Sequence, residues 1–357
     1  MLARVVENVY WLARYLERAE NTARLVSVNT NLLLDLPKGL TPGWQPLIDI
    51  TGSREIFDAR ASRADERDIV QFLIADTENP GSIVASFKMA RENARTLRDI
   101  FPTDTWELLN QFFMEFIEEL PTGLNKRNRF TFLKRIVLTS QTITGALEGT
   151  MNRNDAYTFL LLGRNLERAD MTSRIVDVRS AQLLPDDAPE LRPFDTIQWM
   201  SVLKSLSGYE MYRLSRRTRV SRTDVLEFVL RGEQFPRACG FSLRQIEQCL
   251  LALPRSAGVL DALAGVIRFL GEADLAALDQ SGLHELIDRL QLHIIGVHDG
   301  IAQTYFPSRG GGAAVMRQMQ WSDAGVKTLP LFGDSGPASG ETAVAGARGL
   351  SQPVETR

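Results

Sequence analysis

Cysteine is nearly absent from this chain of 357 residues, in which Cys239 and Cys249 are the only two. If both lie on one helix, they are about 15 Å apart at 1.5 Å per residue, which is too far for a disulfide bond. Two unpaired thiols are typical of a reducing compartment. An apolar run of about 18 residues is also missing, so no membrane span is expected. Charged residues interrupt the apolar positions of the N-terminus, which does not resemble a signal peptide, and we expect a cytoplasmic protein.

Patterns that mark catalytic or cofactor sites are missing as well. The sequence contains no glycine-rich loop between a strand and a helix, and no Walker A, HExxH or CxxC motif. Its histidines are His284, His293 and His298, and their spacings of nine and five do not place them on one face of a helix. A ferritin-like di-iron centre needs Glu-x-x-His pairs on two helices, and none occurs. We therefore expect no metal site and no cofactor, and the sequence identifies no catalytic residue.

A large net charge is missing too. The 41 lysine and arginine residues nearly balance the 44 aspartate and glutamate residues, which gives a formal net charge of -3. This balance predicts neither a nucleic-acid-binding surface nor one that binds an anionic membrane. Hydrophobic residues make up 44% of the chain and charged residues 24%, as in ordinary soluble globular proteins. The basic residues are mostly arginine, whose planar guanidinium group suits carboxylates and phosphates.

One stretch of the sequence occurs twice. Residues Leu12 to Val28 read LARYLERAENTARLVSV, and residues Leu162 to Val178 read LGRNLERADMTSRIVDV, at a constant offset of 150. Ten of the seventeen aligned pairs are identical, whereas average composition gives about one match by chance. Weaker matches follow at offsets up to 156, including Trp199 on Trp44 at 155. We interpret these matches as an internal duplication, with insertions and deletions confined to loops.

The apolar residues follow a helical pattern. Spacings of four and three predict a first helix from about Ala3 to Leu34. A second helix is expected around Trp44 to Phe57, and another after Asp65, which is a good N-cap. A further helix should start at Asn79-Pro80, with Asn as the N-cap and Pro at the first helical position. Pro121 and Gly123 are expected to break the helix that follows.

These elements define the predicted architecture. No period-2 strand pattern of any length occurs, so we predict an all-α, internally duplicated multi-helix bundle. It covers residues 1–307, with one repeat at about 1–149 and the other at about 150–307. From Ser308 the composition changes to RGGGAA and then to DSGPASGETAVAGARG. We predict that residues 308–357 form a disordered tail.

The repeated helices share a charged stripe. At 100° per residue, Arg14, Glu17 and Arg24 fall within an arc of roughly 80°, away from the apolar seam. Solvated ion pairs are worth only about 0.3–0.5 kcal/mol each, so an exposed stripe could diverge freely, yet the two copies keep it in register. This favours a buried or half-buried role. The predicted central network comprises four residues of each copy: Arg14, Glu17, Arg18, Arg24, Arg164, Glu167, Arg168 and Arg174.

Two roles remain open for this network. The two helices are expected to pack across a pseudo-two-fold axis, with Glu17 and Glu167 pairing with arginines of the opposite copy. Buried ion pairs need satisfied partners, since losing one partner costs about 3–5 kcal/mol. The network is then either purely structural or also a site for an anionic group. Arginines that outnumber the glutamates could offer bidentate donors to a carboxylate or phosphate.

The Glu-Arg pairs, Glu17-Arg18 and Glu167-Arg168, resemble the repeated motif of the bacterial Alpha-E family, a helical domain of unknown function. Other matching stretches are YWLARYLERAENTARL from Tyr10, NPGSIVASFKMARENARTLRD from Asn79, LSGYEMY from Leu206 and FPRACGFSL from Phe235. The resemblance covers about residues 1 to 307. It implies partners, because family members occur beside, or fused to, circularly permuted ATP-grasp proteins and transglutaminase-like proteins. The implied system forms amide or peptide bonds in an ATP-dependent reaction.

Three functions follow as hypotheses. We favour a non-catalytic accessory protein that binds the ligase, its substrate or its peptide product. The alternative is an enzyme of the same pathway, in which a buried Glu17 or Glu167 acts as a general base on an anionic amino-acid or peptide substrate. Surrounding arginines would lower the pKa of such a glutamate and weaken this version. The third is a purely structural dimerisation module, in keeping with a possible homo-oligomer.

Overall fold

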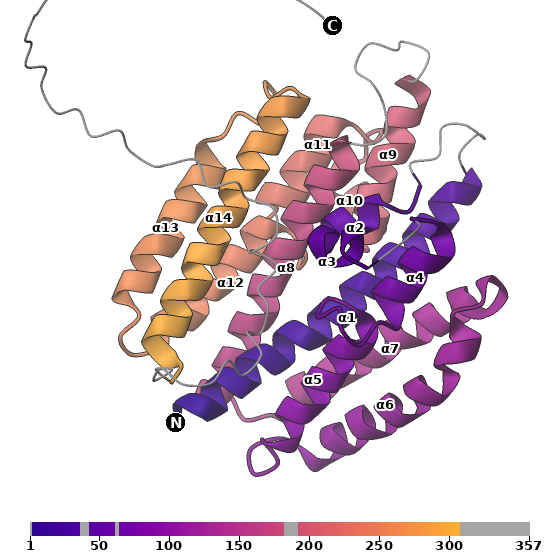
Figure 1. The fold of residues 1–357 in the computed structure, drawn as a ribbon. Helices are drawn as coiled ribbons and strands as arrows, with labels where there is room; N and C mark the ends of the chain where they lie inside the picture. Colours follow the sequence, from indigo (N-terminus) through magenta and orange to yellow (C-terminus); the bar gives the residue numbers. More distant parts are fainter. Residues whose placement is uncertain (1, 36–42, 61–63, 182–191, 308–357) are drawn as a thin grey trace, which may run out of the picture. The chain divides into compact units, whose positions relative to one another are not determined.

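The computed structural model describes residues 2–35, 43–60, 64–181 and 192–307. These residues belong to one compact unit, Met1–Gly325, whereas a second unit, Val326–Arg357, lies outside the described residues. Every regular element in the described ranges is a helix (Figure 1), which confirms the all-α prediction. The tail predicted to be disordered, 308–357, also lies outside the described residues.

Two long helices form the centre of the described unit. Helix α1 (Ala3–Asp35) packs along α8 (Asp155–Ala181), and both lie between the other helices (Figure 1). The first helix ends within one residue of its predicted end. Its apolar seam is buried, because the side chains spaced by three and four residues all face neighbouring helices; the fully or almost fully buried members are Val9, Leu12, Leu16, Ala19, Ala23 and Val26.

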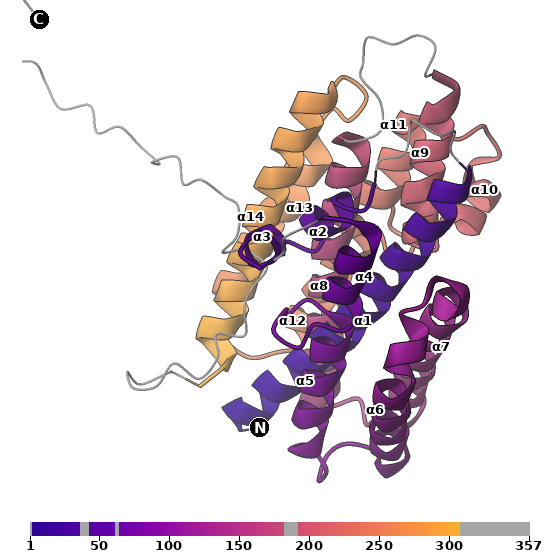
Figure 2. The same ribbon diagram turned by 45° about the vertical axis from the view of Figure 1, so that its right-hand side comes forward.

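Further helices lie beside each member of this central pair. Beside α1 lie α5 and α7, with α6 packed on both; beside α8 lie α12 and α14, with α13 packed on both (Figure 2). The two halves of the chain therefore share a contact pattern, while the duplication itself stays an interpretation of the sequence. The bounds of these helices are α5 Ile83–Arg95, α6 Thr103–Gly123, α7 Lys126–Thr150, α12 Cys239–Leu251, α13 Ala257–Glu272 and α14 Gln280–Tyr305.

Shorter helices complete the described unit. In the first half, α2 packs on α8, and α4 packs on α1 and α5; in the second half, α9 packs on both central helices. A π-helical turn, Glu227–Arg231, directly continues α11. The bounds are α2 Pro46–Ile50, α3 Arg54–Asp58, α4 Glu66–Ile74, α9 Arg192–Ser205, α10 Tyr209–Arg216 and α11 Arg222–Leu226. No helix in the described part of the chain is long and apolar enough to cross a membrane.

The single helix predicted around Trp44 to Phe57 is wrong, because the structure divides it into α2 and α3. The interruption lies at Thr51 and Gly52. The Thr51 hydroxyl donates to the carbonyl of Leu47 at 2.9 Å, and Gly52 adopts a φ of 61°. This left-handed backbone conformation suits glycine and ends a helix.

Helix starts were predicted correctly in one case and wrongly in another. Asp65 caps α4, since its side chain accepts a hydrogen bond from the backbone N–H of Asp68 at 2.9 Å. The predicted start at Asn79-Pro80 is wrong, because α5 begins at Ile83 and Ser82 is its N-cap. The Asn79 side chain is buried and instead accepts from the N–H of Gly81 and donates to the carbonyl of Phe72.

Of the two residues predicted to break this helix, Gly123 is the last residue of α6, whereas Pro121 lies inside it. A proline removes one intrahelical hydrogen bond and is most disruptive in the middle of a helix. Here it lies in the last turn, where few further hydrogen bonds depend on it. The helix then stops directly before α7, at Leu124.

Candidate functional site: the buried arginine and glutamate network

The contact between α1 and α8 brings the two Glu-Arg motifs together. Arg18 donates from Nε to Oε1 of Glu167 at 2.6 Å and from Nη2 to Oε2 at 3.0 Å. In the opposite direction, Arg168 donates from Nε to Oε2 of Glu17 at 2.9 Å. Each motif therefore supplies the arginine that pairs with the glutamate of the other. A role of this network in ligand binding stays a prediction.

Glu167 is the centre of one half of the network. Besides Arg18, it accepts a hydrogen bond from Nε of Arg14 at 2.7 Å. Its side chain is fully buried, and burial by itself would raise the pKa of this carboxyl. The charges and hydrogen bonds of Arg18 and Arg14 outweigh that effect and lower the pKa. Glu167 is thus held as a carboxylate between two guanidinium groups.

A tyrosine and a histidine extend this half. The hydroxyl of Tyr10 lies 2.7 Å from Nδ1 of His298, and Nη1 of Arg14 lies 3.3 Å from the same nitrogen. A guanidinium group has only donors, so Nδ1 accepts and the imidazole carries its proton on Nε2. Burial, aided by the charge of Arg14, lowers the pKa of His298 to about 3. Burial raises the pKa of Tyr10 to about 12, so both side chains are neutral near pH 7.

Glu17 is the centre of the other half. It accepts from Arg168 and also from Nη1 of Arg237 at 2.6 Å. Burial would raise the pKa of Glu17, but the charges of Arg168 and Arg237 lower it to about 2. Arg237 also donates from Nη2 to Glu20 at 2.7 Å, and Arg24 donates to the same carboxylate at 2.6 Å.

Arg237 connects three parts of the chain. It lies just before α12, and its Nη1 also donates to Oδ1 of Asn21 in α1 at 2.7 Å. Its own backbone carbonyl accepts from the hydroxyl of Thr172 in α8 at 2.7 Å. Sequence reasoning did not place Arg237 or His298 in the network. The FPRACGFSL stretch from Phe235 was a signal for Arg237, whereas the sequence gives none for His298.

The eight predicted residues do not all meet. Arg14, Glu17, Arg18, Glu167 and Arg168 form the core of the network, and Glu20 links Arg24 to it. The remaining two make separate pairs. Arg164 pairs with Glu148 of α7 at 2.6 Å, and Arg174 pairs with Asp170 of its own helix at 3.0 Å.

Positive charge exceeds negative charge in the network. The ion pairs described above join five arginines, counting Arg237, to the three glutamates Glu17, Glu20 and Glu167. At Arg168, burial lowers the pKa most, and the neighbouring charges of Arg237 and Arg164 lower it further, despite the attraction of Glu17. Such an arrangement holds two helices together and also favours an added anionic group over a cation.

Comparisons with known proteins agree with the motif at this site. A family described as a predicted alpha-helical domain with a conserved ER motif matches residues 1–306. Relatives include the uncharacterized protein Mb2597 of Mycobacterium bovis and the uncharacterized protein Rv2567 of Mycobacterium tuberculosis. Each is 22% identical over 339 residues, which cover 86% of this chain and 37% of the relative. The chain thus spans well under half the length of these relatives. No solved structure gives a significant match.

Proposed function

The chain belongs to the Alpha-E family, and from this premise we propose that it is a helical accessory protein of a bacterial amide- or peptide-forming system with an ATP-grasp-type ligase. It binds the ligase, its substrate or its peptide product and does not itself catalyse the reaction. Its partners are a circularly permuted ATP-grasp protein and a transglutaminase-like protein, as the family resemblance implies.

The length of the relatives supports a partner. The matched region makes up 37% of each relative, so there an equivalent domain shares its chain with a larger additional region. Covalent linkage keeps two domains at a high effective concentration. In these relatives the equivalent domain is therefore held close to a second region, which supports a proposal in which this domain contacts a partner.

The non-catalytic part of the proposal rests on the ion pairs that the two central carboxylates form with arginines. A general base near neutral pH needs a pKa close to 7. The pKa of Glu17 is lowered to about 2 by its arginines, and that of Glu167 is also lowered. Both side chains already use their oxygens as acceptors for two arginines each. These properties favour a rigid binding domain over an acid-base catalyst.

Co-purification tests the proposal. The full chain with an affinity tag is expressed in its native host and isolated under gentle conditions, and retained proteins are identified by mass spectrometry. We expect an ATP-grasp-type ligase to be retained, and the tag alone serves as the control. A soluble, folded chain that retains no such ligase contradicts the proposal. When a ligase is retained, its turnover with and without the chain shows whether binding affects the reaction.

The excess of positive charge favours one alternative, an enzyme of the same pathway that acts on an anionic amino acid or peptide. In this case arginines of the network would hold the substrate carboxylate. The variants Glu17→Gln and Glu167→Gln separate the two functions. If a variant still binds the ligase but the amide- or peptide-forming reaction stops, the chain is acting as an enzyme. If the variant binds the ligase and the reaction is unchanged, the accessory function is supported.

A further inference from the structure

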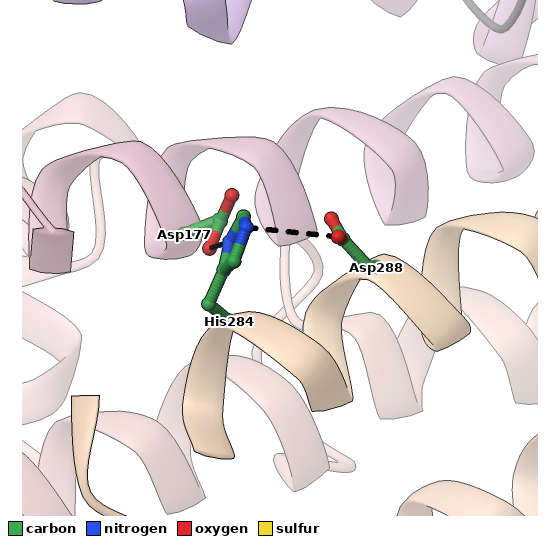
Figure 3. Close-up of side chains that lie close together, drawn as sticks. All are labelled: Asp177, His284 and Asp288. Atoms are coloured by element: carbon green, nitrogen blue, oxygen red, sulfur yellow. Dashed lines mark hydrogen bonds and ion pairs between the residues drawn. The ribbon is translucent and has the colours of Figure 1, made fainter. Parts of the chain in front are cut away.

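A second cluster of ionisable side chains lies where the last turns of α8 approach the first turns of α14. Figure 3 shows the imidazole of His284 between the carboxylates of Asp177 and Asp288. Nδ1 of His284 lies 2.7 Å from Oδ1 of Asp177, and Nε2 lies 3.6 Å from Oδ2 of Asp288. Each of the three residues has a possible ligand atom, and these three atoms lie within 4.8 Å of one another.

Asp177 fixes the imidazole of His284. The 2.7 Å distance identifies a hydrogen bond, in which Nδ1–H donates to the carboxylate. Asp177 is itself buried, with 8% of its surface exposed, so it holds the ring in one orientation. In the neutral imidazole this bond leaves the lone pair on Nε2. A histidine that binds a metal through one nitrogen commonly donates its other N–H to a carboxylate in this way.

Asp288 lies on the opposite side of the ring. At 3.6 Å, its contact with Nε2 is too long for a hydrogen bond. Two ligand atoms that both bind a tetrahedral zinc ion at about 2.0–2.2 Å lie roughly 3.3–3.6 Å apart, which matches this distance. His284 and Asp288 are four residues apart on α14 and therefore share one face. Their side chains are 55% and 51% exposed, so an ion can enter from solvent.

We propose that Nε2 of His284 and the carboxylate of Asp288 bind a divalent ion of the zinc class, with Asp177 as a positioning residue. Water completes the coordination shell, so the site is open and its ion exchanges more readily than in a structural site with four protein ligands. The histidine spacing gave no sign of this site, because one histidine suffices and its partners are carboxylates. The proposal is independent of the function of the arginine and glutamate network.

Calorimetric titration with Zn²⁺ tests the proposal. The full untagged chain is first treated with a chelator and then titrated at pH 7.5. We expect one site of modest affinity per chain, since the protein supplies two ligands; His284→Ala should abolish it and Asp288→Asn should weaken it at least about tenfold. Asp177→Asn keeps both ligands and is expected to weaken binding by about 10- to 100-fold, the usual effect of removing a carboxylate that orients a metal-bound histidine.

His293→Ala is the matched control. His293 lies on the same helix and packs edge-on against Phe269, with ring centroids 4.8 Å apart. We expect this variant to bind Zn²⁺ as the unmodified chain does. Circular dichroism checks that each variant is folded, which is expected because the two proposed ligands are exposed. Absence of Zn²⁺ binding, or equal binding by His284→Ala and the unmodified chain, overturns the proposal.

Discussion

Arg18 donates hydrogen bonds to both carboxylate oxygens of Glu167, at 2.6 and 3.0 Å, across the contact between α1 and α8. The two side chains are 1% and 0% exposed, so this bidentate pair is withdrawn from water. Arg168 and Glu17 form the corresponding pair in the other direction. Each Glu-Arg motif thus neutralises the other, and neither helix can bury its motif alone without a large desolvation cost.

We predict that Arg18→Ala strongly destabilises the protein. The substitution leaves Glu167 buried with only Arg14 as a charged partner, and breaking a buried pair in this way costs about 3–5 kcal/mol. Guanidinium unfolding, followed by circular dichroism, measures the change. The control is Arg244→Ala, which removes a pair with Glu233 in which the side chains are 51% and 61% exposed. Exposed pairs contribute about 0–1 kcal/mol, and equal effects of the two substitutions would contradict the prediction.

Arg237→Ala should destabilise the protein nearly as much as Arg18→Ala, although Arg237 lies outside the two repeated stretches. Its guanidinium group donates to Glu17, Glu20 and Asn21, so its loss leaves two buried carboxylates with fewer partners. Arg237→Lys should restore only part of the stability, because an ammonium group is a point charge without the planar fork. Thermal unfolding of the two variants and the unmodified chain measures the order of their stabilities. Full rescue by lysine would show that charge, rather than geometry, is what Arg237 supplies.

The helix predictions that agree with the structure depend on residues that are close together in the sequence. The seam of α1 and the cap at Asp65 depend on residues three or four positions apart, and both agree with the structure. Asn79 was misread because its side chain forms a local turn by accepting from the N–H of Gly81, and it also donates to the carbonyl of Phe72. Pro121 was misread because it lies in the last helical turn, where the loss of one hydrogen bond is tolerated.

For a related reason, only part of the central network could be predicted from the sequence. The repeat identified Glu17 and Glu167, since a second copy supplies long-range information within one sequence. Arg237 lies 220 positions from Glu17, and His298 lies 288 positions from Tyr10. No periodicity connects residues at such separations, and a lone arginine or histidine has many alternative roles.

The low pKa of Glu17 predicts a loss of stability in acid. Its pKa falls from 4.5 to about 2 on folding, so the folded state binds fewer protons than the unfolded state between these values. The contribution is complete above pH 4.5 and disappears as the pH falls toward 2, by roughly 3 kcal/mol in total. Unfolding of the chain at pH 7 and pH 3 measures the larger part of this loss, because pH 3 still lies above the folded pKa of about 2. Glu17→Gln should be less stable at pH 7 and show a smaller loss at pH 3, whereas Glu233→Gln should keep the full loss.

Gly163 provides a test of the contact between the central helices that involves no charge. It is buried in α8, and a Cβ added there would overlap the backbone carbonyl of Tyr10 in α1. Backbone cannot yield as a flexible side chain can, so Gly163→Ala should force the helices apart and destabilise the protein by about 1–3 kcal/mol or more. Gly145 of α7 is exposed and has no atom within 4 Å of an added Cβ. Gly145→Ala should therefore stabilise by about 0.5–1 kcal/mol, through helix propensity. Guanidinium unfolding distinguishes the two signs, and stabilisation by Gly163→Ala would contradict the close approach of α1 and α8.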